Sequence, residues 1–373
     1  MFSRTTLPNG CTYSVIPYLN TAIASVNLWI RREGRFDLDH LCEHLIAYKL
    51  KRICKGKFPA VIGAKTTQDG YCLFARLPNK FIGEFIELAV SCFALDNQFI
   101  NQKRVDEELA AISNELSSLS PKSKKINLDL GETPEHILNE LTLDLVRSRL
   151  RQLLNGKRWL VEIVGAIQTV EQCRIEAVLN HSFEEKTEYL EQKKIQANDG
   201  ALISVDRDSH MIGVRFDVST PGQWDYHLML IATRLLTGPF NTSLSSILRR
   251  KGLVYSIDRT FYISRGLGRH VLYIETNESG MSESIDLVTQ YFSKNCEFTS
   301  SDVRTALEQS FLLQCIAVEN VATLASRLGT HELCYGNPAP QKHLTTGFDS
   351  SNVERTMDLL ANQYFNLNVE VLD

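Results

Sequence analysis

Apolar and polar positions form two successive series of strand-like and helix-like segments along the chain. In the first series, apolar runs and alternation predict strands at 11–18, 22–30, 71–77 and 159–165. Apolar residues three and four positions apart predict helices at 37–51, 81–95, 101–119 and 141–154. The second series predicts strands at 211–220, 256–264, 270–278 and 368–372, and helices at 224–236, 283–292, 301–328 and 351–364. Because both series have a similar order and end on a helix followed by a strand, the pattern predicts a duplicated α+β unit.

A polar and charged segment at 184–200 separates the two series. We interpret it as an inter-domain linker, which leaves a first domain at 1–183 and a second at 201–373. Each is large enough to bury a full hydrophobic core.

Composition narrows the class of protein. Of 373 residues, 43% are apolar and 23% are charged, which excludes disordered, collagen-like and coiled-coil proteins. Forty basic against 44 acidic residues leave a net charge of −4, so we expect no nucleic-acid partner. We also expect no membrane span and no export signal, because the apolar runs are short and the N-terminus is polar.

Nine cysteines occur singly, and no C-x-x-C pair is present. An odd number of isolated cysteines within apolar segments is typical of reduced thiols that pack in the core. This pattern favours a reducing compartment, and we expect a cytoplasmic protein.

His40, Glu43 and His44 form an H-x-x-E-H motif within the predicted helix 37–51. Helix positions i and i+4 share a face, so both imidazoles can reach one metal ion. Glu43 projects from the same side, where it can reach a water molecule instead of the metal. The motif is the inverse of the H-E-x-x-H helix of zinc peptidases. Two histidines on one helix face are also compatible with a purely structural role.

A hydrolytic zinc site needs a third protein ligand, and a carboxylate is a frequent choice. The predicted helix 101–119 carries Glu108 and Glu115 seven residues apart, so both lie on one stripe. Glu115 fits the ligand, and Glu108 fits a carboxylate that orients a ligand histidine. Taken alone, acidic residues on such a helix more often form a solvated face, as we expect for Glu107.

These two helices resemble the zinc site of a known family. The segment HLCEH followed by ELAAISNE is similar to that of the pitrilysin, insulysin and mitochondrial-processing-peptidase family of metallopeptidases. Three further segments agree with this resemblance, which covers nearly the whole chain in the expected order: LPNGCTYSVIPYLNTAIASVNLWI, GAKTTQDGYCLFARL and LLTGPFNTSLSSILRRKGLVYSI.

The resemblance implies two homologous α+β domains, each a mostly antiparallel sheet covered by helices. It implies that His40, His44 and Glu115 bind one Zn²⁺ and that Glu43 is the catalytic base. The second domain is expected to contribute Arg249 and Tyr255, which would stabilise the oxyanion. The strand that includes Ala64, Lys65 and Thr66 is expected to bind an extended peptide by strand addition.

Several positions depart from the family pattern. The interval from His44 to Glu115 is shorter than usual, and that from Arg249 to Tyr255 is one residue shorter, so Arg249 or Arg250 can face the substrate. Gly63 stands where the family favours asparagine. Asp39 replaces a small residue and lies either in solvent or against a histidine.

The sequence therefore predicts a zinc endopeptidase that cleaves extended or unfolded peptides, as in processing or leader removal. A two-domain chain resembles the short family members that pair, so we expect a homodimer or a heterodimer with a related subunit. The alternative is a non-catalytic subunit of the same fold that binds peptide or a catalytic partner.

Overall fold

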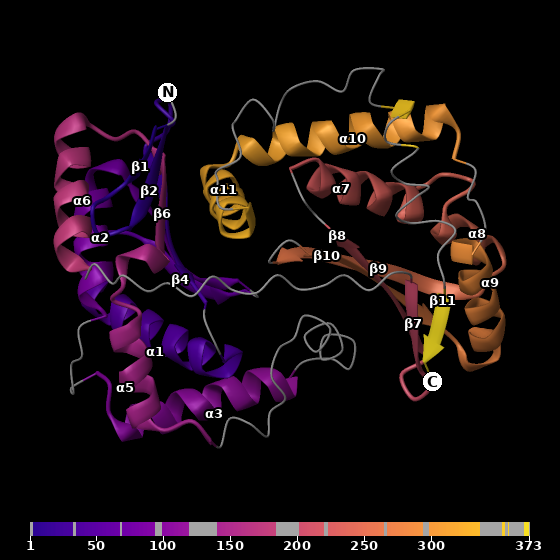
Figure 1. Ribbon diagram of the computed structural model, residues 1–373, viewed down its shortest axis with the longest axis horizontal. Coiled ribbons are helices and arrows are strands. Elements are labelled where there is room, and N and C mark those ends of the chain that lie inside the picture. The colour runs from indigo at the N-terminus through magenta and orange to yellow at the C-terminus, as the bar shows by residue number, and fades with distance from the viewer. Residues whose placement is uncertain are drawn as a thin grey trace. The chain divides into compact units, whose positions relative to one another are not determined.

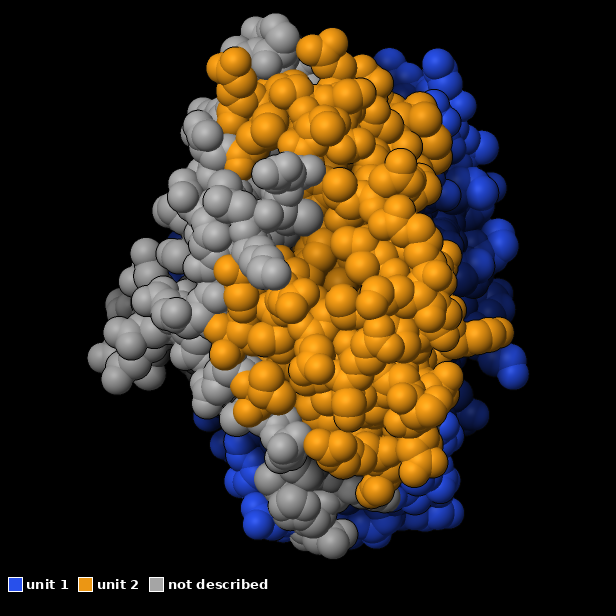
Figure 2. Space-filling view, turned by 90° about the vertical axis from the view of Figure 1, so that its right-hand side faces the viewer, with its two compact units in different colours: residues 1–192, 318–338 blue, residues 193–317, 339–373 orange. Residues whose placement is uncertain are grey.

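The chain divides into two α+β units, and we describe each by itself (Figures 1 and 2). The computed structural model describes residues 3–32, 35–67, 69–93, 99–118, 140–183, 201–219, 223–264, 267–293, 298–335, 353–354, 357 and 369–372. Unit 1 comprises residues 1–192 and 318–338, and unit 2 comprises residues 193–317 and 339–373.

A six-stranded sheet lies at the centre of unit 1, in the order β1-β2-β6-β3-β5-β4. Its strands are β1 (Ser3–Thr6), β2 (Thr12–Pro17), β3 (Ile23–Arg31), β4 (Val61–Thr66), β5 (Gly70–Pro78) and β6 (Trp159–Gly165). Neighbouring strands are antiparallel except for the parallel pair β2 and β6. Strand β4 therefore forms one edge of the sheet.

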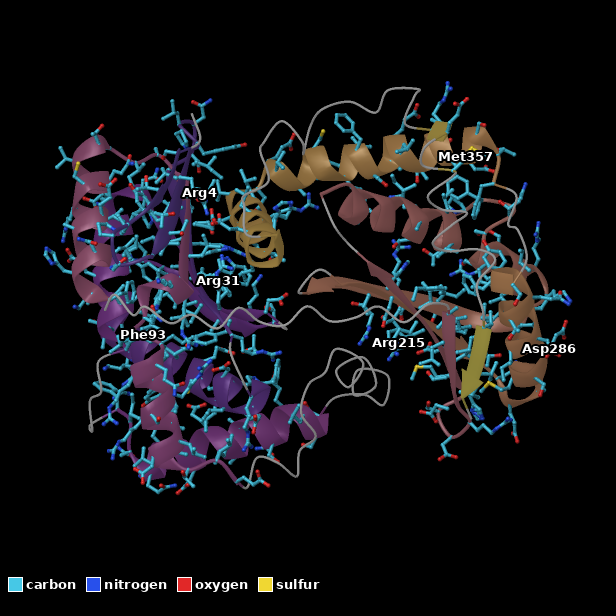
Figure 3. The ribbon with its side chains drawn as sticks, viewed as in Figure 1. Arg4, Arg31, Phe93, Arg215, Asp286 and Met357 are labelled. Carbon is cyan, nitrogen blue, oxygen red and sulfur yellow. The ribbon has the colours of Figure 1, made fainter. Side chains whose placement is uncertain are left out.

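Helices cover one face of this sheet and enclose the main core of unit 1 (Figure 1). They are α1 (Phe36–Cys54), α2 (Ile82–Ser91), α3 (Gln102–Ser118), α5 (Leu143–Gln152) and α6 (Thr169–Ser182). Side chains alternate along β3, so Val26 and Leu28 enter this core while Asn27 and Trp29 face the other side. Phe93, labelled in Figure 3, packs edge-to-face on Trp159 in the core, with ring centroids 4.6 Å apart.

Helix α11 (Val321–Tyr335) covers the opposite face of the sheet. Its Leu333 packs on a buried cluster of Trp29, Cys72 and Leu160. At Gly329 the helix approaches so closely that a Cβ atom would lie 1.9 Å from the Trp29 indole nitrogen. Residues 318–338 thus belong to unit 1. We expected them in the second domain, 201–373, because they follow the predicted linker 184–200.

Unit 2 is built on a five-stranded sheet in the order β11-β7-β8-β10-β9. Its strands are β7 (Ala201–Asp206), β8 (Met211–Ser219), β9 (Val254–Ser264), β10 (Leu267–Thr276) and β11 (Val369–Leu372). Its helices are α7 (Gln223–Thr237), α8 (Leu244–Arg250), α9 (Met281–Ser293) and α10 (Ser300–Val318). As in unit 1, a single parallel pair, here β7 and β11, joins an otherwise antiparallel set of the described strands. The predicted fold class of two α+β units is confirmed.

The predicted continuous helix 301–328 is wrong, because the chain forms α10 and α11 with a break between them. The Asn320 side chain accepts hydrogen bonds from the backbone nitrogens of Ala322 and Thr323, at 2.9 and 3.1 Å. An asparagine cap of this kind starts a new helix. The predicted helix 351–364 lies largely outside the described residues. Helix α6 and strands β1 and β7 had no counterpart in the prediction.

Two further features of the described residues concern the cysteines and the length of the helices. The cysteines whose side chains the structure describes are free, and most of them are buried. Among the described residues no single helix is long and apolar enough to cross a membrane, although α10 and α11 taken as one bent pair reach that length and composition.

Candidate metal centre

Helix α1 carries the H-x-x-E-H motif on a face that its core residues leave open. Cys42, Ile46 and Leu50 are buried at intervals of four residues and fix the opposite side of the helix against the core. Asp37 and Asp39 lie in the first turn, where negative charge stabilises the helix dipole. The imidazoles of His40 and His44 therefore lie one above the other, with ring centroids 4.9 Å apart.

Helix α3 brings Glu108 and Glu115 to the same place. Val105 and Ile112 are buried and set the orientation of this helix. A carboxylate oxygen of Glu108 lies 3.1 Å from Nδ1 of His44, and one of Glu115 lies 3.6 Å from its Nε2. The ligand atoms of His40, His44 and Glu115 all lie within 4.8 Å of one another. The structure thus brings together all four metal-site residues that these two helices were expected to supply.

This donor set fits a zinc ion. Two ligands of a tetrahedral zinc at 2.0–2.2 Å lie roughly 3.4 Å apart, close to the separation of His44 Nε2 and Glu115. The contact with Glu108 engages Nδ1 of His44, which leaves Nε2 as the metal-binding nitrogen. Two histidines and one carboxylate leave a fourth position for water, as hydrolytic zinc sites require.

Glu43 lies beside the ligands with its carboxylate largely buried. One of its oxygens accepts a hydrogen bond of 2.8 Å from the Thr66 hydroxyl, so strand β4 holds it in place. Burial raises the pKa of Glu43, and the Thr66 bond and the charge of His44 offset this only in part. A carboxylate with a raised pKa and a fixed position is suited to accept and return a proton near neutral pH.

The two histidines have opposite pKa shifts. Burial lowers the pKa of His40 to about 4, so this imidazole is neutral and able to bind a metal at pH 7. Burial also acts to lower the pKa of His44, but its bond with Glu108 and the nearby carboxylates outweigh burial and raise it. For Glu108, the contacts with His44 and Arg104 outweigh burial and lower the pKa, so the carboxylate stays charged.

A cavity of about 530 Å³ opens onto these residues. Helices α1 and α3 and strand β4 supply its lining residues, which are Phe36, His40, Glu43, His44, Ala47, Tyr48, Lys51, Ala64, Lys65, Thr66, Glu108, Glu115 and Leu116. The predicted substrate strand therefore lies along the cavity. The Lys65 ammonium group lies over the Trp29 ring at 4.7 Å and bonds to the Ser326 hydroxyl at 2.6 Å, on the face of the sheet that α11 covers.

Asp39 lies neither in solvent nor against a histidine. Its two carboxylate oxygens accept hydrogen bonds of 2.6 and 3.0 Å from the guanidinium group of Arg149 on α5. Both side chains are buried, so the pair fixes the first turns of α1 next to His40. The partner lies 110 residues away in sequence, and no local pattern identifies it.

Arg249 and Tyr255 belong to unit 2, and both side chains are exposed there, Tyr255 to 90%. The guanidinium group of Arg250 donates a hydrogen bond of 2.8 Å to the backbone carbonyl of Asn241. Arg250 is thereby engaged in holding the turn before α8, which leaves Arg249 as the better candidate for contact with a ligand.

Sequence reasoning missed Arg104, Tyr48 and Lys51. The guanidinium group of Arg104 stacks on the Tyr48 ring at 3.3 Å and bonds to Glu107 and Glu108. It thus holds the carboxylate that contacts His44. For Tyr48 and Lys51 a signal was available, because they follow His44 by four and seven residues and so share its helix face.

Comparison with known proteins identifies the fold. Residues 140–310 match the family model described as the Peptidase M16 inactive domain. A protease from Helicobacter pylori superposes with a TM-score of 0.76 at 15% identity, over 96% of both chains. A chain of complex III2 from Candida albicans, bound to Inz-5, gives 0.76 at 14% identity, over 96% of this chain and 92% of that one. A candidate M16-like peptidase from Alicyclobacillus acidocaldarius gives 0.69 at 13% identity, over 100% and 98%.

This chain shares the α+β fold of these three structures over nearly its whole length. No curated protein sequence matches it. The match to the M16 inactive domain begins after α3, so it contains none of His40, His44 and Glu115. The comparisons therefore establish the architecture, while the expected zinc site depends on the geometry of unit 1.

Proposed function

We propose that this M16-fold protein is a zinc-dependent endopeptidase that cleaves peptides held in extended form. The single observation that carries the proposal is the convergence of His40, His44 and Glu115, whose ligand atoms lie within 4.8 Å of one another. A buried carboxylate, Glu43, stands next to these ligands and is not needed as a ligand itself.

Each residue of the candidate site would have a separate role in hydrolysis. His40, His44 and Glu115 would hold one zinc ion, which supplies Lewis acidity and lowers the pKa of a water molecule. Glu43 accepts a proton from the attacking water and returns it to the leaving amine. Glu108 holds Nδ1 of His44, and Thr66 keeps the Glu43 carboxylate directed at the cavity.

Strand β4 is the proposed substrate-binding strand, because it is an edge strand and lies along the cavity. A peptide that adds to an edge bonds chiefly through its backbone, which allows many sequences. Ala64 and Thr66 direct their side chains toward α1, whereas Lys65 points to the opposite face. The contribution of Lys65 to peptide binding is therefore assigned to its backbone.

Arg249 and Tyr255 are proposed to stabilise the developing oxyanion, and their exposure on unit 2 leaves them available for contact. We further propose that the chain acts as a homodimer or with a related subunit. The single, mostly buried cysteines favour a reducing compartment such as the cytoplasm.

The test compares the wild-type chain with Glu43→Gln, after loading with zinc and removal of excess metal. We expect both proteins to retain about one zinc, while the variant loses hydrolysis of an internally quenched peptide by roughly 10²–10⁴-fold. The matched control is Asp106→Asn, an exposed carboxylate on α3 outside the cavity, which should cleave at the wild-type rate. Equal turnover in Glu43→Gln and the wild type, or cleavage that resists a chelator, would contradict the proposal.

A second candidate function is that of a non-catalytic subunit that binds peptide or a catalytic partner. The match of residues 140–310 to the M16 inactive domain and the likeness to a chain of complex III2 favour it. The same measurement separates the two functions. A chain that binds zinc weakly and cleaves no peptide, yet binds peptides along β4, supports the second function.

A further inference from the structure

The cavity continues along α1 beyond the metal ligands. His40, His44, Tyr48 and Lys51 follow one another at intervals of four, four and three residues, so they form one stripe, and all four line the cavity. The part of the cavity that contains His40 and His44 also contains three carboxylates, those of Glu43, Glu108 and Glu115. Lys51 brings a positive charge to the same wall.

Lys51 is exposed, and it forms no hydrogen bond or ion pair with any of the described residues. The other cavity lysine, Lys65, differs, because its ammonium group is bonded to Ser326 on the far face of the sheet. The nearby Arg104 is paired with Glu107 and Glu108. Lys51 lines the same cavity as Glu43 and the two ligand histidines, so its charge faces the space in which a bound peptide would lie.

The direction of β4 relative to α1 places Lys51 along the path of a bound peptide. Residues 55–60 join the end of α1 to the start of β4, and Thr66 bonds to Glu43. The strand therefore runs antiparallel to the helix, with Val61 toward the Lys51 end. A peptide that adds antiparallel to β4 then runs in the direction of α1, so the residues on the carboxyl-terminal side of its scissile bond approach Lys51.

Distances along α1 and along an extended peptide indicate which peptide residue lies near the Lys51 ammonium group. Lys51 lies seven residues after His44, which is about 10 Å along a helix axis. Its side chain leans back toward the N-terminus of α1, which brings the ammonium group nearer to the ligands. An extended peptide advances about 3.3 Å per residue, so two residues cover roughly 7 Å. The small side chain of Ala64 on β4 faces this region.

We propose that Lys51 selects substrates that present a carboxylate about two residues beyond the scissile bond on its carboxyl-terminal side. The carboxylate is either an Asp or Glu side chain or the free C-terminus of a short peptide, since both offer the same chemistry. This inference rests on the proposed peptidase function and adds a substrate class to it.

The test uses the zinc-loaded full chain and one internally quenched peptide sequence with Glu, Gln or Lys at each of three positions on both sides of the cleaved bond. One series has amidated C-termini, and a second has free carboxylates at varied distances from the bond. We expect about a tenfold preference in kcat/KM for Glu over Gln at the second position on the carboxyl-terminal side of the bond in the first series. In the second series we expect a similar preference for the free over the amidated terminus when the peptide ends about two residues beyond the bond.

Three variants test whether Lys51 causes this preference for a carboxylate. Lys51→Met should reduce it to within about twofold, and Lys51→Glu should favour the peptide with Lys. Lys55→Glu, which changes an exposed lysine outside the cavity in the same way, should retain the preference of the wild type. Cleavage of the Glu, Gln and Lys peptides at rates within twofold by the wild type would overturn the inference. An equal loss for all peptides in Lys51→Met would also overturn it, because Lys51 would then act only on the catalytic groups.

The failure of the proposed function gives a different result. If the wild type cleaves none of the peptides, the peptidase proposal fails, and fluorescence anisotropy with the same peptides measures the carboxylate preference as binding. Tighter binding of the Glu peptide that is lost in Lys51→Met supports the inference, whereas equal binding of the Glu and Gln peptides overturns it.

Discussion

The buried ion pair between Asp39 and Arg149 should be a main support of the metal-binding helix. It joins α1 to α5 through two hydrogen bonds, of 2.6 and 3.0 Å, and the side chains are 0% and 6% exposed. Burial raises the pKa of Asp39, and the bonds and charge of Arg149 lower it only in part. The carboxylate therefore depends on its partner to be tolerated at this position.

We expect Arg149→Met to lower the free energy of unfolding of unit 1 by about 3–5 kcal/mol, because it leaves a buried carboxylate without its partner. Arg174→Met is the matched control, since Arg174 pairs with Glu87 at 2.8 Å but both side chains are largely exposed. The control should cost less than about 1 kcal/mol. The double variant Asp39→Leu/Arg149→Met should recover most of the loss, because it removes both charges together.

Urea unfolding followed by tryptophan fluorescence measures these differences, since Trp29 and Trp159 are both buried in unit 1. The ion-pair argument would be refuted if Arg149→Met were as mild as Arg174→Met. It would also be refuted if the double variant were as unstable as the sum of the two single variants, because the two residues would then act independently.

Two further predictions concern the packing of α11 and the pH dependence of unit 2. Gly329→Ala should lower the free energy of unfolding of unit 1 by about 1–3 kcal/mol, since the new Cβ would overlap the Trp29 ring; a gain in stability in urea unfolding would contradict this. Burial lowers the pKa of His270 to about 3, so the unfolded chain takes up a proton below about pH 6.5 while the folded unit does not. The free energy of unfolding should therefore fall as the pH drops from 6.5 toward 3, by up to about 1.4 kcal/mol per unit, and His270→Gln should flatten this slope in thermal unfolding at several pH values.

The two helices of the candidate site could be predicted because their faces depend only on local spacing. His40 and His44 share a face through an interval of four residues, and Glu108 and Glu115 share one through an interval of seven. That α1 and α3 lie side by side did not follow from either pattern. It was implied by the family resemblance, and the described structure places the four side chains together.

Contacts between distant residues could not be predicted in this way. Asp39 and Arg149 lie 110 residues apart, and Glu43 and Thr66 lie on different elements that only the folded sheet brings together. The break between α10 and α11 was missed for a different reason. The apolar spacing runs on through Asn320, and one side chain that caps a helix does not interrupt it.

The alternation of apolar and polar residues along the strands of unit 1 does not show which element covers each face of the sheet. Ser14, Asn27 and Glu162 lie on the side away from the main core, and such polar positions are typical of a face that meets water. In the structure all three are buried, because residues 318–338 return and place α11 over this side. Burial, reinforced by the charge of Glu332, raises the pKa of Glu162 well above its usual range, which favours the neutral form of the carboxyl group.

Helix α11 meets this polar face with polar groups of its own. Glu332 accepts hydrogen bonds of 3.1 and 2.8 Å from the guanidinium group of Arg4, which is labelled in Figure 3, at the β1 edge of the sheet. At the opposite edge, Ser326 binds Lys65 of β4, the proposed substrate-binding strand. The helix thus contacts both edges of the sheet. Because Trp29 lies between Gly329 and Lys65, the position of α11 is coupled through one buried ring to the strand that borders the metal centre.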